Sequence, residues 1–282
     1  MRVPTGRAPT LPRMNMPPIA FIGGGNMASA LIGGLVKAGR PAASILVVEP
    51  FEPQRDKLAQ AFGIAALPSA SDALLQATTV VWAVKPQTFA EAAAACAGRV
   101  GQALQLSVMA GIRSDAIVAA SGSARVVRAM PNTPALIGRG IAGLFARPEV
   151  DAAARAEIDA LFAPTGQSLW VAHEHDLDAV TAVSGSGPAY VFYVLEAMVQ
   201  AATEMGLTAD QGRTLAQATF AGAAALAQAS PLQPAELRAQ VTSKGGTTHA
   251  AITSLDDSGV KAAFVKALHA ARNRAEALGR TG

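Results

Sequence analysis

A glycine-rich turn near the start of the chain restricts its fold more than any other feature. An apolar run at residues 19–23 leads into Gly23-Gly24-Gly25-Asn26-Met27-Ala28, and a helical pattern follows over residues 27–38. The turn fits the pattern G-x-G-x-x-A in the strand–turn–helix setting that a dinucleotide site requires. Gly23 permits the tight turn, and Gly25 lets the backbone approach a pyrophosphate at the N-terminus of the helix. We expect the dinucleotide to contact Ile22, Gly23, Gly25, Asn26 and Met27.

Strand and helix patterns alternate through the first part of the chain. Short runs of Val, Ile and Leu indicate strands that are covered on both faces. We expect strands at residues 19–23, 44–49, 79–84, 103–109 and 124–129, and helices at residues 27–38, 53–62, 89–97 and 115–120. This alternation predicts an α/β fold with a doubly wound parallel sheet of the Rossmann type.

Strand patterns end at about residue 178, and the rest of the chain is expected to be all-helical. Pro188 suits the first turn of a helix that ends at Gly206, and Thr208 with Gln211 predicts a capping box for the next helix. Three further helices are expected, over residues 234–241 and beginning near residues 248 and 258. These helices are rich in Ala and Gly and form a thin core by themselves, so we expect an obligate dimer or higher oligomer. The expected domains are a flexible tail at 1–17, a dinucleotide-binding domain at 18–172 and a helical dimerisation and substrate domain at 173–282.

Composition excludes several classes of protein. Of 282 residues, 51% are hydrophobic and 15% charged, which allows a large core. The net charge of +3 comes without a dense basic stripe, so nucleic acid is not an expected partner, and no apolar run is long enough to span a bilayer. Cys96 is the single cysteine, which excludes an internal disulfide and is typical of a reducing cytoplasm.

The titratable residues do not suggest a catalytic group of their own. The histidines do not have the spacing of metal ligands, so we expect no metal site, and no Ser/His/Asp arrangement is evident. The four histidines are His173, His175, His249 and His269. This favours chemistry that a cofactor carries and the protein orients.

Loop residues follow the other expected strands, whose carboxyl ends meet at one edge of a parallel sheet. Glu49 ends the second strand, where a carboxylate holds the adenosine ribose diol and disfavours a 2′-phosphate. Arg55 either pairs with such a phosphate or is a solvated helix residue, so the choice between NADH and NADPH stays open, with NADH slightly favoured. Two further loops are expected at the cofactor: Ala83, Val84, Lys85 and Pro86, and then Met109, Ala110 and Gly111.

A second glycine-bearing loop lies far along the chain, at Thr242-Ser243-Lys244-Gly245-Gly246-Thr247-Thr248. Its glycines expose backbone N–H groups just before a helix, and its hydroxyls add donors, which together suit a carboxylate. A plain Gly-Gly linker is the alternative. Two other polar segments, at residues 128–134 and 184–188, either contact a ligand or serve as a structural turn and a close helix crossing.

Five segments together closely resemble pyrroline-5-carboxylate reductase: residues 21–28, 83–87, 127–134, 178–190 and 241–248. The stretch at 178–190, Asp-Ala-Val-Thr-Ala-Val-Ser-Gly-Ser-Gly-Pro-Ala-Tyr, is close to a signature of that family. The resemblance covers residues 18–279. It implies a Rossmann domain followed by a helical dimerisation domain, and reduction of the cyclic imino acid 1-pyrroline-5-carboxylate to L-proline with NADPH or NADH. It also implies interlocking dimers that often assemble further, commonly into decamers.

The resemblance also assigns site residues by position. The substrate carboxylate is expected to meet Ser243, Gly245, Gly246, Thr247 and Thr248. Thr248 matches the threonine that hydrogen-bonds the ring nitrogen and is the catalytic candidate, while Glu174 and Thr181 match positions near the substrate across the dimer.

Two positions depart from the family pattern. Lys244 stands where the family usually has proline, so the loop loses a stiff residue and gains a cation. Ala70 stands near a position often held by asparagine at the adenosine ribose, which shifts that contact to Ser69 or Ser71.

Two other functions remain open. One is a related imine or keto-acid reductase of the Rossmann-plus-helical group. The hydroxyacid members of that group use a lysine of the helical domain, and Lys244 is the lysine near the expected site. The other is a nucleotide-binding protein without turnover, although the hydroxyl-bearing loop argues against it.

Overall fold

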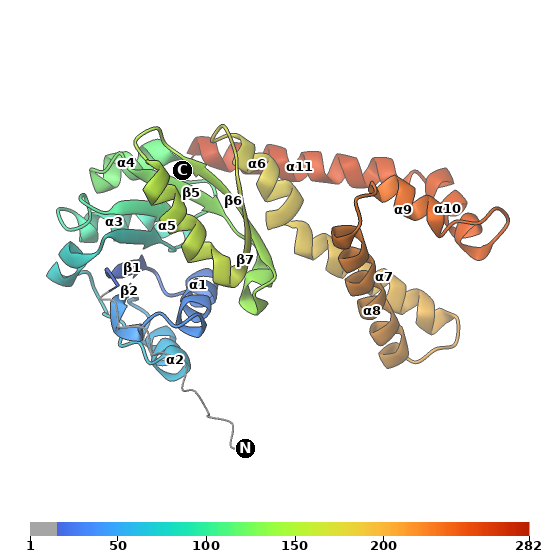
Figure 1. The fold of residues 1–282 in the computed structure, drawn as a ribbon, viewed down its shortest axis with the longest axis horizontal. Helices are drawn as coiled ribbons and strands as arrows, with labels where there is room; N and C mark the ends of the chain where they lie inside the picture. Colours follow the sequence, from blue (N-terminus) through green and yellow to red (C-terminus); the bar gives the residue numbers. More distant parts are fainter. Residues whose placement is uncertain (1–15, 282) are drawn as a thin grey trace, which may run out of the picture. The chain divides into compact units, whose positions relative to one another are not determined.

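The computed structural model describes residues 16–281, which form two compact units (Figure 1). The first unit holds residues 16–177 and 278–281, and the second holds residues 178–277. The units therefore separate after Leu177, near the domain boundary expected at residues 172/173, and the end of the last helix belongs with the first unit. The flexible tail expected at residues 1–17 lies outside the described residues except for Met16 and Pro17.

A seven-stranded sheet forms the centre of the first unit, with strand order β2-β1-β3-β4-β5-β6-β7. The strands are β1 (Ile19–Ile22), β2 (Ile45–Val48), β3 (Thr79–Trp82), β4 (Leu104–Ser107), β5 (Val126–Met130), β6 (Gly140–Ala146) and β7 (Gly166–Trp170). The first five strands are parallel. Strand order reverses direction at β1, which has β2 on one side and β3 on the other. In open α/β sheets, ligands bind at the carboxyl ends of the strands beside such a switch point.

The doubly wound parallel sheet expected from the sequence is confirmed for β1 to β5, and its far edge adds strands, one of them antiparallel, that the sequence did not reveal. β6 runs antiparallel to β5, with Arg128 opposite Phe145, and β7 is parallel to β6. All five expected strands are present, with ends within two residues of those predicted. The missed elements are β6, β7 and the helix between them, α5 (Ala152–Phe162).

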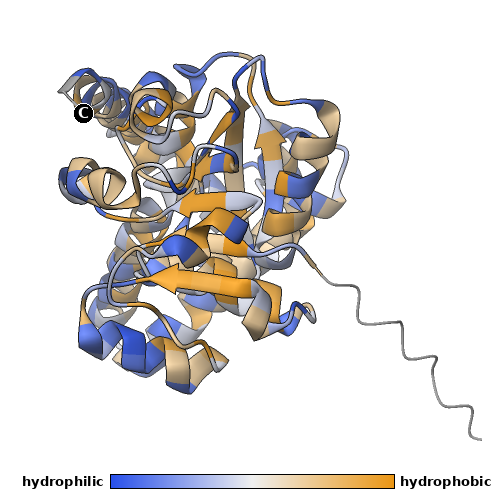
Figure 2. Ribbon diagram, turned by 90° about the vertical axis from the view of Figure 1, so that its left-hand side faces the viewer, coloured by the Kyte–Doolittle hydropathy of each residue, from blue (hydrophilic) through white to orange (hydrophobic). Residues whose placement is uncertain are grey.

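Helices cover both faces of this sheet. One face packs against α1 (Asn26–Lys37), α2 (Glu52–Phe62) and α5, and its core includes Phe21, Leu31 and Phe162. The other face packs against α3 (Phe89–Cys96) and α4 (Ser114–Ser121), and its core includes Trp82 and Ile117. Because both faces are covered, β1, β2 and β3 are almost uniformly hydrophobic. Figure 2 shows orange strands inside the layers of helices.

Short turns of 3₁₀-helix connect several of these elements, at Ala42–Ser44, Asp72–Gln76, Pro86–Thr88, Thr133–Ile137 and Ala163–Thr165. The turn at Pro86–Thr88 begins directly after Lys85 and leads from β3 into α3.

The second unit is helical, as the sequence predicts. Its helices are α7 (Gly187–Glu204), α8 (Ala209–Ala229), α9 (Pro234–Gln240), α10 (Thr247–Asp257) and most of α11 (Val260–Thr281). The predicted capping box at the start of α8 is confirmed, because Thr208 Oγ1 accepts from Gln211 N while Gln211 Oε1 accepts from Thr208 N. α7 and α8 approach closely at Gly212, where a Cβ atom would lie 2.9 Å from the Cβ of Ala202.

Small side chains alone fill the interior of the second unit. Among its described residues the buried hydrophobics are alanines, namely Ala182, Ala202 and Ala216. Large apolar side chains lie on its surface instead, including Phe192 at 58% exposure and Tyr193 at 74%. In the described part of the chain, no helix is both long and apolar enough to cross a membrane.

Candidate active site

The glycine turn between β1 and α1 is held tightly against two neighbouring strands. Gly23 has φ +96°, and a Cβ atom there would lie 2.8 Å from the carbonyl oxygen of Ala83. Its N–H donates to the carbonyl oxygen of Val48 at 2.8 Å. Only glycine fits this position, because a side chain would be strained by the positive φ and would collide with backbone.

Gly25 is the N-cap of α1 and leaves the start of the helix open. Its φ is −63° and its ψ −170°, and no side chain caps the helix. A Cβ atom at Gly25 would meet nothing within 4 Å. No side chain therefore blocks the first N–H groups of α1. Free N–H groups of this kind bind a phosphate at a helix N-terminus.

Glu49, the residue after β2, fastens the turn from the other side. Its Oε2 accepts the N–H of Gly24 at 2.8 Å, and its Oε1 accepts the N–H of Phe51 at 2.9 Å. The guanidinium of Arg55 donates to the carbonyl oxygens of Glu49, at 3.1 Å, and Pro50, at 2.7 Å. Glu49 and Arg55, which are both expected at the cofactor, thus lie beside the turn, and each side chain forms hydrogen bonds with backbone groups.

Gln54 is a member of this site that the sequence did not suggest. Its Nε2 donates to the carbonyl oxygen of Gly24 at 2.5 Å, and Ser29 Oγ donates to the same oxygen at 3.1 Å. Nothing local to residue 54 reveals this contact, because it depends on how α2 packs beside α1.

A cavity of about 310 Å³ opens beside the turn, at the carboxyl ends of β1, β2 and β3. Four predicted cofactor residues line it: Ile22, Gly23, Ser69 and Val84. Ala70, which the sequence places near the adenosine ribose, lines it as well, and the wall is completed by Val48, Pro50, Pro68, Thr88, Glu91, Ala92, Ala95 and Cys96. Burial raises the pKa of the Cys96 thiol, and nearby Arg99 opposes this shift.

The two other loops that are expected at the cofactor also follow the carboxyl ends of strands. Residues 83–86 follow β3 and lead into the turn that precedes α3, with Lys85 exposed. Residues 109–111 follow β4, and Met109 is buried while Ala110 is exposed. Gly111 has φ +78°, and a Cβ atom there would lie 3.3 Å from the Cβ of Leu278. The end of α11 therefore packs against this loop, a long-range contact that the sequence did not reveal.

Glu174 is anchored within the first unit. Its Oε1 accepts the N–H of Ser114 at 2.6 Å and the Nη1 of Arg128 at 2.8 Å, and its Oε2 accepts the Ser114 hydroxyl at 2.8 Å. The side chain of Arg128 is only 7% exposed. The carboxylate thus sits at the N-terminus of α4 and ties the segment after β7 to β5.

Asn132 has a structural partner in the turn that follows β5. Its Oδ1 accepts the N–H of Ile141 at 3.0 Å, which links the end of β5 to the start of β6. Of the two interpretations open for residues 128–134, this contact supports the structural turn.

The second glycine-bearing loop belongs to the second unit, where it leads into α10. Gly245 has φ +76°, and Gly246 is the N-cap of α10 without a side-chain cap. The N–H of Gly246 donates to the carbonyl oxygen of Ser243 at 3.1 Å, which closes the loop. Thr247 and Thr248 form the first turn of the helix, and Ser243, Lys244 and Gly245 are exposed. The loop therefore presents helix N–H groups and hydroxyls together, a donor set that suits a carboxylate.

A π-turn occupies the signature stretch that precedes α7. It runs over Thr181–Gly185, and the N–H of Ser186 donates to the carbonyl oxygen of Thr181 at 2.8 Å. Such turns are frequent at functional sites. The sequence predicts the helix that begins near Pro188 but not the widened turn before it.

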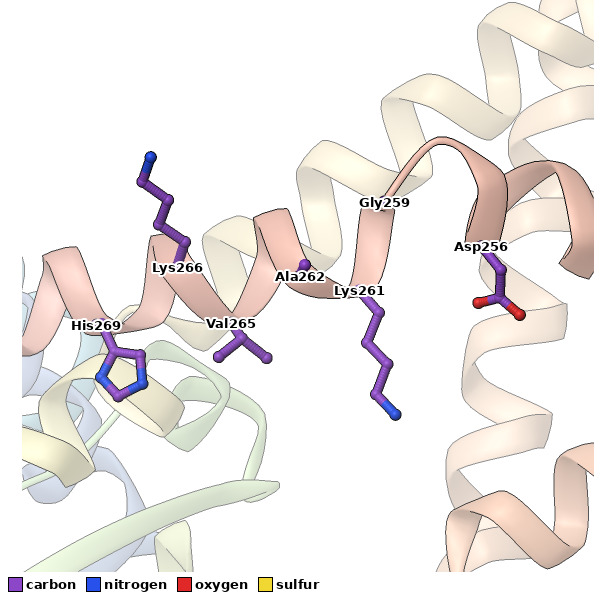
Figure 3. Close-up of a pocket in the computed structure, with 7 residues that line it drawn as sticks. All are labelled: Asp256, Gly259, Lys261, Ala262, Val265, Lys266 and His269. Atoms are coloured by element: carbon purple, nitrogen blue, oxygen red, sulfur yellow. The ribbon is translucent and has the colours of Figure 1, made fainter.

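One hollow in the second unit is lined by none of the predicted site residues. It has a volume of about 640 Å³ and is lined by Asp256, Gly259, Lys261, Ala262, Val265, Lys266 and His269 (Figure 3). Lys261, Val265 and His269 project from one side of α11, and Lys266 projects from the other.

Comparisons with known proteins agree with this division of the chain. Residues 18–111 match the family model for NADP oxidoreductase, coenzyme F420-dependent, and residues 174–278 match the model for pyrroline-5-carboxylate reductase dimerisation. The chain is 44% identical to pyrroline-5-carboxylate reductase of Pseudomonas aeruginosa, over 94% of this chain and 98% of that one. The chain belongs to the pyrroline-5-carboxylate reductase family.

Solved structures of pyrroline-5-carboxylate reductases share the fold along the same length. The enzyme from Coxiella burnetii superimposes with a TM-score of 0.87 at 35% identity, covering 94% of this chain and 99% of that one. The enzyme from Plasmodium falciparum, solved with NADP bound, gives a TM-score of 0.83 at 25% identity and the same coverage. The predicted family and fold class, a Rossmann domain followed by a helical dimerisation domain, are confirmed.

Proposed function

We infer that this chain reduces 1-pyrroline-5-carboxylate to L-proline by hydride transfer from NADPH or NADH, the last step of proline biosynthesis. The observation that carries this inference is the near full-length match to reductases of that name, at 44% identity in one case. The open N-terminus of α1 and the adjoining cavity supply a cofactor site of the required kind.

We propose that the cofactor lies along the carboxyl edge of the sheet. Its pyrophosphate would rest on the N–H groups at Gly25, Asn26 and Met27, and its adenosine would enter the cavity beside Ser69. Glu49 would take the ribose hydroxyls through lone pairs that its backbone contacts leave available. The loops at residues 83–86 and 109–111 would line the nicotinamide end.

We propose that the loop before α10 holds the substrate. The carboxylate of the imino acid would accept from backbone N–H groups of Gly246, Thr247 and Thr248, with Ser243 adding a hydroxyl. Gly245 supplies the positive φ that the loop needs, and the ammonium of Lys244 would add positive charge beside the carboxylate. Glu174 and Thr181 are assigned to the surroundings of the substrate by resemblance.

The proposed reaction needs no strong general acid or base from the protein. When bound, the reduced nicotinamide supplies a hydride that adds to the carbon of the C=N bond. A substrate that binds as the protonated iminium already carries the proton that the ring nitrogen retains in proline. Thr248 would orient that nitrogen by a hydrogen bond, and much of the rate would come from holding donor and acceptor carbons together.

We further propose that the helical unit forms a homodimer and that dimers assemble into a decamer. The second unit buries only small side chains, yet it exposes large apolar ones on α7, including Val191, Phe192 and Tyr193. Apolar surface of this kind is stabilised by a partner. The single cysteine is consistent with an enzyme of the cytoplasm.

Loss of nicotinamide absorbance with synthetic 1-pyrroline-5-carboxylate tests the proposed activity, with NADH and NADPH assayed in parallel. We expect oxidation of the cofactor and formation of one L-proline for each cofactor consumed. Activity restricted to a 3-hydroxy acid or to unrelated imines would instead identify a related reductase. Tight cofactor binding without oxidation by any imino acid would identify a nucleotide-binding protein.

A further inference from the structure

The segment that follows β7 brings two histidines and an aspartate together on the surface of the first unit. His173 Nδ1 lies 3.5 Å from Asp176 Oδ2, and His175 Nε2 lies 3.5 Å from Asp176 Oδ1. One ligand atom from each of the three residues lies within 4.8 Å of the others. The two imidazole rings face each other with centroids 5.2 Å apart and 15° between their planes.

These separations suit a small transition-metal ion. Around a tetrahedral zinc ion with bonds of about 2.1 Å, neighbouring ligand atoms are about 3.4 Å apart. Each histidine nitrogen lies at about that distance, 3.5 Å, from one oxygen of Asp176. The two rings must turn out of their stacked arrangement on binding, because a metal ion lies in the plane of each imidazole that holds it. Two imidazoles and one carboxylate are a ligand set that selects Zn²⁺ and its first-row neighbours over Mg²⁺ or Ca²⁺.

The backbone that carries the three side chains is fixed independently of any ion. Glu174 lies between the histidines and is held by Ser114 and Arg128 through three hydrogen bonds. The N–H of His173 donates to Asp176 Oδ2 at 2.9 Å, and the N–H of Asp176 donates to the carbonyl oxygen of His173 at 3.1 Å. Glu174 is anchored, and the histidines on either side of it both reach the carboxylate of Asp176. Little ordering of the backbone is therefore needed when an ion binds.

Solvent has access to this cluster. The side chains of His173 and His175 are 69% and 75% exposed, and that of Asp176 is 37% exposed. An ion can therefore enter from water and keep one or more water ligands, as at open three-ligand zinc sites.

We propose that His173, His175 and Asp176 bind a divalent transition-metal ion of the Zn²⁺ class. The three ligand residues are distinct from those assigned to the cofactor turn and to the loop before α10. The bound ion bridges the two ends of the turn that leads from β7 into α6 (Asp176–Val180), and so stabilises that turn. The sequence predicts no metal site because the spacing of the four histidines matches no established motif. The local turn produces the cluster.

Calorimetric titration of Zn²⁺ into the tag-free, chelator-treated full-length protein tests the proposal. We expect one ion per chain with micromolar or tighter affinity, and at least tenfold weaker binding in His173→Ala, in His175→Ala and in Asp176→Asn. His269→Ala is the matched control, because His269 is an exposed histidine on α11 outside any such cluster among the described residues, and it should bind as the unmodified protein does.

A thermal scan with and without Zn²⁺ gives a second measurement. The ion should raise the melting temperature of the unmodified protein and of His269→Ala, but not that of His173→Ala. Circular dichroism of each variant without metal checks that it folds. Absence of micromolar binding by the unmodified protein would overturn the proposal. Binding by the three ligand variants that is as tight as that of the unmodified protein would also overturn it. Loss of binding in His269→Ala alone would overturn it as well.

Discussion

The carboxylate of Glu49 accepts the backbone N–H of Gly24, with 2.8 Å between Gly24 N and Glu49 Oε2. One side chain therefore both fixes the glycine turn and places a negative charge where the adenosine ribose is proposed to bind. A 2′-phosphate is repelled by that charge, whereas a ribose diol is not. The balance between NADPH and NADH should thus depend on the charge at residue 49.

We expect Glu49→Gln to raise the ratio of kcat/KM for NADPH to that for NADH by about tenfold, or ~1.4 kcal/mol. The amide oxygen can still accept from Gly24, which keeps that contact of the glycine turn while the charge is removed, although the contact with the N–H of Phe51 is lost. Steady-state kinetics with both cofactors measures the ratio. Glu52→Gln, an exposed acid in the first turn of α2, is the control and should leave it unchanged. An unaltered ratio in Glu49→Gln would separate Glu49 from the ribose.

Two glycines of the same turn should respond differently to alanine. A Cβ atom at Gly25 meets nothing within 4 Å and its φ is −63°, so Gly25→Ala should change the free energy of unfolding by less than about 1 kcal/mol. The methyl group nevertheless occupies the approach of the pyrophosphate, so the KM for NADPH should rise at least about tenfold. Denaturant unfolding and steady-state kinetics measure the two effects.

Gly23→Ala is the matched comparison. Its Cβ would lie 2.8 Å from the carbonyl oxygen of Ala83, at a φ of +96°. Strain and backbone collision should lower the free energy of unfolding by about 2–4 kcal/mol. Equal stability of the two variants, or normal cofactor affinity in Gly25→Ala, would contradict the geometry described for this turn.

The sequence predicted the parts of the fold that depend on local pattern. Buried runs such as Ile19–Ile22 and Thr79–Trp82 are wholly apolar or nearly so, and glycine marks the end of α2, where Gly63 has φ +69°. β7 was missed because its side chains are mostly exposed or half-buried, which leaves no apolar run to recognise. β6 contains two glycines, which weaken a strand pattern, and its antiparallel pairing with β5 is not encoded locally.

The candidate site divides in the same way. The glycine turn and the loop before α10 carry their donor groups in consecutive residues, so the sequence predicts both as binding loops, and those roles stay predictions. Gln54 and Leu278 reach residues expected at the cofactor only through packing of α2 and of the end of α11. The cluster at His173 and His175 depends on one tight turn, whose shape follows from contacts with residues 60 positions earlier.

Thr248 should matter to catalysis rather than to folding. Loss of its proposed hydrogen bond to the substrate nitrogen should cost about 1–3 kcal/mol in the transition state. Thr248→Ala should therefore lower kcat/KM for the imino acid by about five- to 150-fold. Thr248→Ser keeps the hydroxyl and should recover most of this loss. Thr253→Ala is the control, since Thr253 Oγ1 donates within α10 to the carbonyl oxygen of His249. Unchanged kinetics in Thr248→Ala would remove this residue from the mechanism.

Glu174 should stabilise the first unit. Removing its carboxylate leaves the guanidinium of Arg128, which is only 7% exposed, without this partner, and deprives Ser114 of two acceptor contacts. Loss of one member of a buried ion pair costs about 3–5 kcal/mol, and the 21% exposure of Glu174 places the expected loss for Glu174→Ala near the lower end. Calorimetric unfolding measures this change.

Glu149→Ala provides the comparison for that measurement. Glu149 is 46% exposed and its Oε2 lies 3.7 Å from Arg147 Nε, so its removal should cost less than about 1 kcal/mol. A Glu174→Ala protein as stable as Glu149→Ala would mean that the contacts with Ser114 and Arg128 contribute little to folding.

Cys96 should report on occupancy of the cofactor cavity. It is 1% exposed and lines the cavity beside the glycine turn. Burial raises the pKa of its thiol, so at pH 8 the folded protein holds less of the reactive thiolate than the unfolded chain does. Alkylation by iodoacetamide, followed by mass spectrometry, should therefore be at least about tenfold slower in the native protein than in denaturant. NADPH should slow it further by closing the route through the cavity, whereas proline alone should not; equal rates with and without NADPH would show that the cofactor does not occupy this cavity.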